Sequence, residues 1–166
     1  MIMFNKLKVY NQLLELDDLT PAKRNESLTG VFKRDFVDSS VSFRGKTVEP
    51  TPKDGEDTMS ILLRHLTTKT ENKDESHREY DRDRSIRIHW VKHHISEKTP
   101  DKIEVFSTQD RGGIRTYIFD RDESYVVILE PRRDGGSYYL ITAYYLKGNN
   151  CRKIENKLKR KLSCIY

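Results

Sequence analysis

The sequence predicts an α+β fold, with N-terminal helices followed by a four-stranded antiparallel sheet and a basic C-terminal helix. Three observations support this. Apolar residues in the first third of the chain recur at helical spacing, runs rich in β-branched and aromatic residues follow closely between residues 103 and 145, and a cationic helical pattern begins after residue 149. Helices packed on one face of an antiparallel sheet are typical of this class.

A length of 166 residues fits one domain, and we expect a single domain over residues 1–166 with three parts. Residues 1–67 are predicted to be mainly helical, residues 68–84 to form a polar loop, and residues 85–166 to form the α+β core. The apolar stripe that predicts the first helix consists of Phe4, Leu7, Tyr10, Leu13 and Leu14.

The next elements are predicted from cap and turn residues. Thr20 followed by Pro21 is typical of a helix start, because Thr caps the first free amides and Pro fits the first turn. The run VSFRGKTVEP predicts a short hairpin that turns at residues 44–46. Asp57 is a candidate cap for the apolar helix TMSILLRHLT that follows it.

The central region is polar before it becomes apolar. Residues 68–84 alternate in charge, which favours a solvated loop or an exposed helix turn. The run SIRIHWVKHHI comes next, with Ser85 as a candidate cap. Its apolar residues fall at helical spacing, although their alternation before Trp90 leaves a short strand as an open alternative.

The sheet is predicted from four runs, IEVFSTQD, GIRTYIFD, YVVILEP and YYLITAYYLKG. Segments rich in Gly, Asp and Ser separate them, which is the pattern of successive hairpins. The last run leads into CRKIENKLKRKL. There Ile154, Leu158 and Leu162 recur every four residues and predict the buried side of a helix.

The formal net charge is +5, and the cationic excess lies near the C-terminus. Residues 147–166 contain seven Lys or Arg and one Glu, whereas residues 1–57 contain nine Lys or Arg and ten Asp or Glu. A local cationic surface attracts polyanions such as RNA, although a solubilising helix face would give the same pattern. We expect substrate-binding roles for Lys153, Lys157, Arg160 and Lys161.

The two cysteines, Cys151 and Cys164, show no metal-ligand spacing and give no disulfide framework, which fits a reducing compartment. The sequence shows neither a signal peptide nor a run of about 18 apolar residues. We therefore expect a cytoplasmic protein without a membrane partner.

Histidines are the first candidates for chemistry, because imidazole transfers protons near neutral pH. His89 precedes the only tryptophan, which would fix its backbone, and His65 lies near the end of an apolar helix. Both are candidate catalytic residues, with a structural role as the open alternative. His89 and His93 are spaced like a zinc-binding pair, but no third ligand is evident, and we expect neither a metal nor another cofactor.

Arginines at strand ends are candidates for holding a phosphate, because a guanidinium donates a planar fork of hydrogen bonds. Arg115 precedes the run TYIFD, and Arg132 follows YVVILEP. In LITAYYL, alternation places Thr142 and Tyr144 on one face of a strand, where their hydroxyls can position a ribose or a phosphate. Each of these residues has a structural alternative as a turn, rim or core residue.

Cleavage of RNA without metal needs few groups. A base removes the proton of the ribose 2′-hydroxyl, an acid protonates the departing 5′ oxygen, and cations stabilise the phosphorane. A His, one or two Arg, a Thr and a Tyr meet these needs. Metal-dependent DNA cleavage would require clustered carboxylates, whereas the densest acidic cluster, at residues 71–83, is interleaved with basic residues.

The runs RSIRIHWVKHHI, IEVFS and RTYIFDRDESYVVILEPRRDGGSYYLITAYYLKG, in this order, resemble the phage- and polymorphic-toxin-associated nucleases of the barnase–EndoU–colicin–RelE-like (BECR) superfamily. The resemblance covers about residues 84–163 and extends weakly to His65. It implies helices followed by a four-stranded antiparallel sheet, and ribonuclease activity on structured RNA such as tRNA. Carried over residue by residue, it implies catalytic roles for His89, Arg132, Thr142 and Tyr144.

The sequence therefore predicts a metal-independent endoribonuclease, a toxin or phage-associated effector whose partners are RNA and an antitoxin or immunity protein. The alternative is a non-catalytic RNA- or protein-binding module on the same scaffold. The prediction depends on one geometric expectation. An imidazole from the segment around Trp90 should meet guanidinium and hydroxyl groups of the sheet in a shared cationic hollow.

Overall fold

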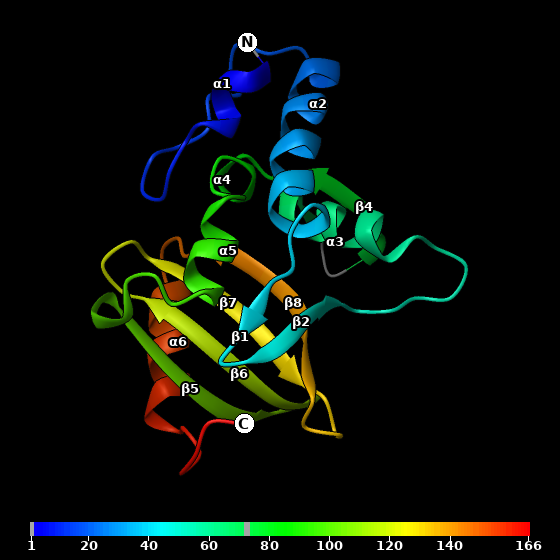
Figure 1. Ribbon diagram of the computed structural model, residues 1–166. Coiled ribbons are helices and arrows are strands. Elements are labelled where there is room, and N and C mark those ends of the chain that lie inside the picture. Colours follow the sequence, from blue (N-terminus) through cyan, green and yellow to red (C-terminus); the bar gives the residue numbers. More distant parts are fainter. Residues whose placement is uncertain (1, 72–73) are drawn as a thin grey trace.

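The structure, a computed structural model that describes residues 2–71 and 74–166, is built around one curled sheet (Figure 1). Its strands are β1 (Ser42–Phe43), β2 (Lys46–Pro50), β5 (Ile103–Asp110), β6 (Gly113–Asp120), β7 (Tyr125–Pro131) and β8 (Ser137–Tyr145). They lie in the order β1–β2–β8–β7–β6–β5. Helices pack against this sheet, so the α+β class is confirmed.

The four predicted strands form the antiparallel meander β5–β8, in which Val105 lies opposite Ile118 and Val127 opposite Ala143. The prediction of a four-stranded sheet is nevertheless wrong, because β1 and β2 extend it to six strands. β2 pairs in parallel with β8, with Val48 opposite Tyr138. The sequence pattern of a hairpin predicts its own turn, but it does not predict which distant strand the hairpin joins.

The β1–β2 hairpin turns where the sequence predicts. Arg44 and Gly45 have φ angles of 50° and 81°. A two-residue turn with positive φ at both positions matches the right-handed twist of the flanking strands. The amide of Val48 also donates to the carbonyl of Val41 over 2.9 Å, which continues the pairing beyond the two residues of β1.

The predicted first helix is mostly absent. α1 covers only Ile2–Lys6, and the chain then runs irregularly to residue 20. Asn11 has a φ of 67°, which a helix does not accommodate. We call residues 7–19 the N-terminal strap. The amide of Leu14 donates to the carbonyl of Ile86 over 2.9 Å, so the strap is held by groups distant in sequence that helical spacing does not reveal.

Two of the three predicted helix caps are confirmed. Thr20 begins α2 (Pro21–Phe32) by accepting a hydrogen bond from the amide of Lys23, and a short π-helical segment, η1 (Lys33–Val37), continues it. Asp57 begins α3 (Thr58–Thr67) by accepting from the amide of Ser60 over 3.0 Å.

Residues expected to form a polar loop instead form a two-stranded hairpin, β3 (Thr68–Glu71) and β4 (Asp74–Tyr80). Thr68 lies opposite Tyr80 and Thr70 opposite Arg78. Thr and Tyr favour strands, and the described side chains alternate as in a strand with one covered face: Lys69, His77 and Glu79 are exposed, whereas Thr68, Thr70, Arg78 and Tyr80 are half-buried. The charge pattern alone was therefore a poor guide to the backbone conformation.

Two short helices follow the hairpin, α4 (Arg82–Ser85) and α5 (Trp90–Ile95). Asp81 caps α4 by accepting from the amide of Arg84. Ser85 is therefore not the predicted cap but the last residue of α4, and its hydroxyl donates to the carbonyl of Thr67 over 3.1 Å. A 3₁₀ turn, η2 (Pro100–Lys102), leads into β5.

The meander buries a different core on each face. Its N-terminal face packs against the N-terminal helices and α5, and carries Ile118, Tyr125, Val127, Leu129 and Leu140. The opposite face, which we call the α6 face, packs Phe106, Tyr117, Phe119 and Val126 against Ile154 of α6 (Asn150–Lys159). Among the described helices, none has both the length and the apolar character to cross a membrane.

Candidate functional site

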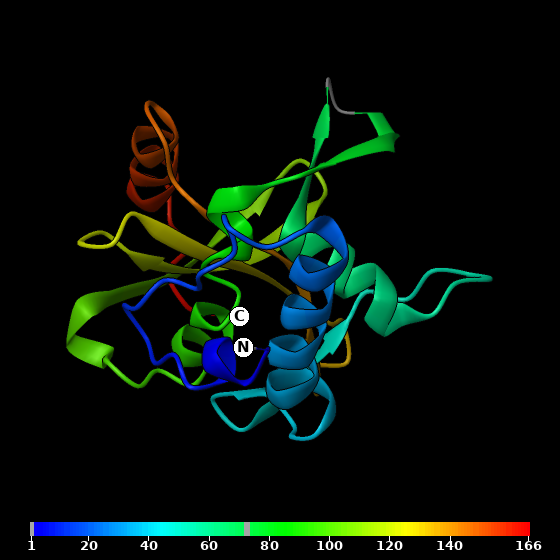
Figure 2. The same ribbon diagram turned by 90° about the horizontal axis from the view of Figure 1, so that it is seen from above.

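α6 covers only part of the α6 face. Beside it, partly exposed side chains of β6, β7 and β8 remain open. Figure 2 shows that α6 and the β3–β4 hairpin rise on the same side of the sheet. We call the open area the trough, and it is formed by Arg84, Arg115, Ile128, Glu130, Arg132, Tyr139, Thr142, Tyr144 and Lys153.

Strand register places the floor of the trough on one face. Ile128 lies opposite Thr142, and Glu130 lies opposite Tyr139. Paired residues of antiparallel strands point to the same side, and Ile128 and Tyr144 both pack beside α6. Thr142 and Tyr144 therefore share a face, as strand alternation predicts.

A β-bulge brings one more side chain to this face. The β7–β8 register shifts between Ile128 and Leu129, where β8 holds an extra residue, Ile141. Because alternation would otherwise place residues three apart on opposite faces, the extra residue lets Tyr139 and Thr142 point the same way. Bulges redirect side chains in this manner and are frequent beside functional sites.

An ion pair occupies the centre of the trough. Nη1 of Arg115, from β6, lies 3.1 Å from Oε1 of Glu130, from β7. The side chain of Glu130 is 33% exposed and that of Arg115 is 19% exposed. The carboxylate is thus accessible to a ligand, while the guanidinium beside it is held close to the sheet.

Arg84 closes one end of the trough. Its Nη1 donates to Oγ1 of Thr142 over 3.3 Å and to the carbonyl of His65 over 3.1 Å. Its Nε lies 3.2 Å from Oδ2 of Asp81, and its guanidinium carbon lies 5.2 Å from the ring centre of Tyr144. The hollow here has a volume of about 410 Å³, and its other lining residues are Lys69, Asp83, Tyr145, Lys147, Asn150 and Lys153.

Arg132 occupies the other end. Its Nη1 donates to Oε2 of Glu49 over 3.2 Å and to Oγ of Ser137 over 3.3 Å. Its guanidinium carbon lies 5.1 Å from the ring centre of Tyr139. The hollow at this end has a volume of about 420 Å³, and it is lined by Glu130, Pro131, Arg132, Arg133, Asp134 and Tyr139.

Burial sets the protonation of the polar groups near Arg84. Burial raises the pKa of Tyr144 despite the opposing effect of the Arg84 guanidinium, so the phenol keeps its proton at neutral pH. Burial also lowers the pKa of Arg84, which the Asp81 carboxylate partly opposes. An arginine remains charged in proteins, so this end offers a cation beside a phenolic proton donor.

The predicted basic residues of the terminal helix divide into two pairs. Lys153 lines the hollow at Arg84, and Nζ of Lys157 lies 3.0 Å from Oδ2 of Asp110. Arg160 and Lys161 are exposed beyond the end of α6 and line neither hollow. Of these four residues, only Lys153 therefore lines a hollow of the trough.

The structure does not place His89 where the predicted catalytic role requires it. The imidazole is buried beneath the N-terminal strap, with Nε2 at 2.9 Å from the carbonyl oxygen of Gln12 and 3.2 Å from that of Val9. Burial is the main cause that lowers its pKa to about 4. The segment around Trp90 packs against the N-terminal face, whereas Arg132 and Thr142 belong to the α6 face. The expected meeting of this imidazole with the sheet groups does not occur.

The remaining predicted catalytic residues, and Arg115, which was predicted to bind the substrate, lie at the trough or at its border. Arg132, Thr142 and Tyr144 line it, and Arg115 is part of its central ion pair. His65 is half-buried on α3, and its backbone borders the hollow at Arg84 through the carbonyl that accepts from the guanidinium.

Sequence reasoning missed three polar residues of the trough, Arg84, Glu130 and Tyr139. Glu130 could have been found, because it is the one carboxylate in the run YVVILEP and alternation places it on the face of Ile128. The face of Tyr139 could not be predicted, because it depends on the β-bulge in β8. Arg84 lies in a charged segment, and no pattern in that segment predicts that its side chain is mostly buried.

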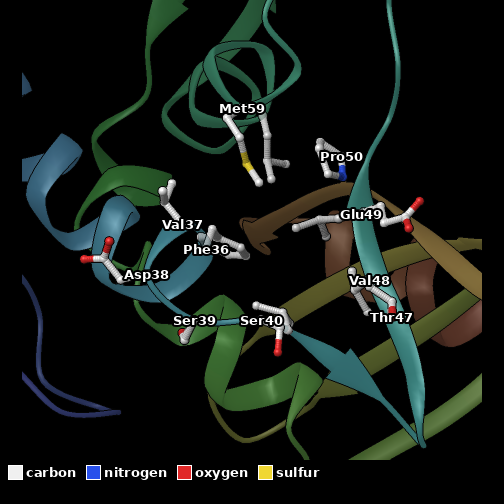
Figure 3. Close-up of a pocket in the computed structure, with 13 residues that line it drawn as sticks. Phe36, Val37, Asp38, Ser39, Ser40, Thr47, Val48, Glu49, Pro50 and Met59 are labelled. Carbon is white, nitrogen blue, oxygen red and sulfur yellow. The ribbon is translucent and has the colours of Figure 1, made fainter.

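A further hollow, of about 370 Å³, lies between η1, β2 and α3 (Figure 3). Phe36, Val48 and Met59 contribute to its mainly apolar walls. Its polar lining residues are Asp38, Ser39, Ser40, Thr47 and Glu49, and because no described Lys, Arg or His lines it, this hollow does not suit phosphate binding. Among the residues that the structure describes, no group of three or more His, Cys, Asp or Glu side chains is placed to hold a metal ion.

Comparison of the chain with protein-family models, with curated proteins and with solved structures finds no match. The resemblance to the BECR nucleases therefore depends on the quoted sequence runs alone.

Proposed function

We propose that this protein is a metal-independent endoribonuclease whose substrate lies in the trough. The observation that carries the proposal is that Arg115, Glu130, Thr142 and Tyr144, from three adjacent strands, share one open face, with Arg84 at one end of it. This set contains a carboxylate base, a protonated phenol and two guanidinium groups, which are the parts that phosphodiester transfer requires.

In the proposed reaction, Glu130 takes the proton of a ribose 2′-hydroxyl. The 2′ oxygen attacks the adjacent phosphorus, the bond from phosphorus to the 5′ oxygen breaks, and a 2′,3′-cyclic phosphate forms. Tyr144 donates its phenolic proton to the departing 5′ oxygen, and burial, which raises its pKa, keeps that proton available. Arg115 holds the Glu130 carboxylate in position through their 3.1 Å contact.

Charge that builds on the phosphorane oxygens needs fixed cations. Arg84 meets this need because its hydrogen bonds to Thr142 and His65 restrict its orientation. Thr142 is in this scheme a positioning residue, and Lys153 adds charge at the same hollow. Lys157 contributes long-range attraction for the RNA backbone rather than a contact in the reaction.

A non-catalytic RNA-binding module is the second candidate, and one observation favours it. In the described part of the chain no histidine lines either hollow of the trough, so the most common acid–base side chain is not available there. The cationic groups and tyrosines would suffice for binding. The two candidates differ in whether the bound RNA is cut.

The test is incubation of the purified protein with total RNA in EDTA. We expect cleavage products that end in a cyclic phosphate, and a loss of at least about 100-fold in rate for Glu130→Gln. The matched control is Glu104→Gln, a 44% exposed carboxylate on β5 that pairs with Arg121 away from the trough. Intact RNA with the wild-type protein would end the nuclease proposal, and salt-sensitive binding without cleavage would support the module.

The proposal extends to a cellular role. An enzyme that cleaves structured RNA such as tRNA would harm the cytoplasm in which it acts, and we propose that it is a toxin or phage-associated effector controlled by an antitoxin or immunity protein. Expression of the wild-type chain in bacteria should arrest growth, whereas Glu130→Gln should not. Equal growth of the two strains at equal protein levels would contradict this role.

A further inference from the structure

We propose that Arg132 and Tyr139 form a stacking subsite for one unpaired nucleobase, so that the substrate is an unpaired stretch of RNA. This inference rests on the proposed function, because it identifies the part of the substrate that lies next to the bond cleaved at Glu130. It also extends that function, since neither the central ion pair nor the hollow at Arg84 distinguishes paired from unpaired RNA.

The two ends of the trough differ in ways that assign them different tasks. Arg84 is 19% exposed and is held by Thr142, His65 and Asp81. The contacts with these three residues fix the direction of the Arg84 N–H donors, which suits a phosphate held in one place. Arg132 is 36% exposed and lies over the partly exposed ring of Tyr139, so this end presents a flat surface to the solvent.

The flat surface is held in place from one side. Nη1 of Arg132 donates to Glu49 and to Ser137, which restricts the guanidinium to a position near the Tyr139 ring. Aromatic rings and guanidinium planes are the surfaces on which proteins stack unpaired bases. Asp134 and Glu130 line the same hollow, and their carboxylates can accept hydrogen bonds from base amino groups.

Register connects this surface to the reaction centre. Tyr139 lies directly opposite Glu130, and directly opposed side chains in antiparallel strands have Cβ atoms about 5 Å apart. A base stacked on Tyr139 would therefore belong to a nucleotide adjacent to the 2′-hydroxyl that Glu130 activates. In a duplex the base faces are occupied by neighbouring bases, so only an unpaired nucleotide can enter.

The experiment compares cleavage of one RNA sequence as an unpaired 12-nucleotide strand and as a duplex. We expect the unpaired strand to be cut at least tenfold faster. Tyr139→Leu should raise the KM for the unpaired strand about tenfold or more with little change in kcat, since stacking contributes binding. Tyr139→Phe retains the ring and should restore the wild-type KM.

The control for Arg132→Ala is Arg44→Ala. Arg44 also lies over an aromatic ring, that of Phe43, and pairs with a carboxylate, that of Glu97, but it is remote from the trough. Arg132→Ala should raise KM and Arg44→Ala should not. Equal cleavage of the two RNA forms, or an unchanged KM in Tyr139→Leu, would overturn the subsite while leaving the nuclease proposal intact.

If the wild-type protein cleaves neither RNA, the proposed function fails and the subsite is still testable by binding. Fluorescence anisotropy of the unpaired strand should then show weaker binding for Tyr139→Leu than for Tyr139→Phe. Equal binding by these two variants would overturn the subsite as well.

Discussion

Nη1 of Arg84 donates a hydrogen bond to Oγ1 of Thr142 over 3.3 Å, although 58 residues separate them in the chain. The bond lies just beyond Leu140, the last β8 residue that pairs with β2. The edge of β8 is therefore open to α4 at this point. One guanidinium thus links the charged middle of the chain to the strand that forms the floor of the trough.

Removal of this bond should weaken catalysis more than folding. Thr142→Val keeps the shape of the side chain but removes the acceptor, and we expect about a tenfold lower kcat with a loss of about 1 kcal/mol in unfolding free energy. Thr142→Ser keeps the hydroxyl and should retain most of the activity. Cleavage kinetics and urea unfolding check both variants, and equal kcat in Val and Ser variants would remove Thr142 from a positioning role.

The lysines and arginines of the terminal segment should contribute unequally to RNA affinity. Lys153 lines the trough, whereas Arg160 is exposed beyond α6. We expect Lys153→Ala to reduce the slope of log K against log salt by about one, as the loss of one phosphate contact does. Arg160→Ala should leave the slope nearly unchanged. Titrations of RNA at several salt concentrations measure both slopes, and a larger change for Arg160→Ala would contradict this placement.

Burial of His89 should make the fold less stable in acid. Its pKa falls to about 4 from an ordinary value of 6.5, mainly through burial. The unfolded chain therefore binds more protons than the folded one between these values, and stability should decrease as pH falls from 6.5 to 4. The contribution of this one group is on the order of 3 kcal/mol.

The measurement is the unfolding free energy from pH 4 to 7 in His89→Gln. Since His93 also has its pKa lowered to about 4, chiefly by burial, the variant should show a shallower pH dependence rather than none. The control is His77→Gln, which changes an exposed histidine of β4 and should keep the wild-type slope. An unchanged slope in His89→Gln would show that this imidazole is not buried as described.

Asp120 should be essential for the packing of the N-terminal strap. Its Oδ2 accepts from the hydroxyl of Tyr10 over 2.6 Å and lies 2.9 Å from Nε2 of His94, and the residue is fully buried. Loss of a charge from such a buried network costs about 3 kcal/mol, and we expect this loss in Asp120→Asn. The neighbouring Asp122→Asn, with a 68% exposed side chain paired with Lys102, should change stability by less than about 1 kcal/mol. Thermal or urea unfolding distinguishes the two.

Local signals in the sequence predicted local structure well. The caps at Thr20 and Asp57 and the turn at Arg44 involve neighbours within a few residues, so the residue types reveal them. The alternation that places Thr142 and Tyr144 on one face is equally local. The stripe from Phe4 to Leu14 did not predict the structure, because Phe4, Leu7 and Leu13 are exposed while Tyr10 contacts α5 and β6, and no periodicity encodes these long-range contacts.

The candidate site was only partly predictable for the same reason. Residue chemistry identified Arg132, Thr142 and Tyr144, which do line the trough. His89 was misplaced because its position before Trp90 indicates burial and not the face on which it is buried. Arg84 is brought in by a long-range contact with Thr142, and a single sequence contains no record of such contacts.

The parallel pairing of β2 with β8 has a consequence for synthesis. Residues 47–50 find their partners only at residues 137–140, and the trough also requires side chains from β6, β7 and α6. A chain still on the ribosome without β8 has no completed sheet edge and no place for Arg84 to dock. The trough can therefore assemble only after the chain up to Lys153 has left the exit tunnel of the ribosome.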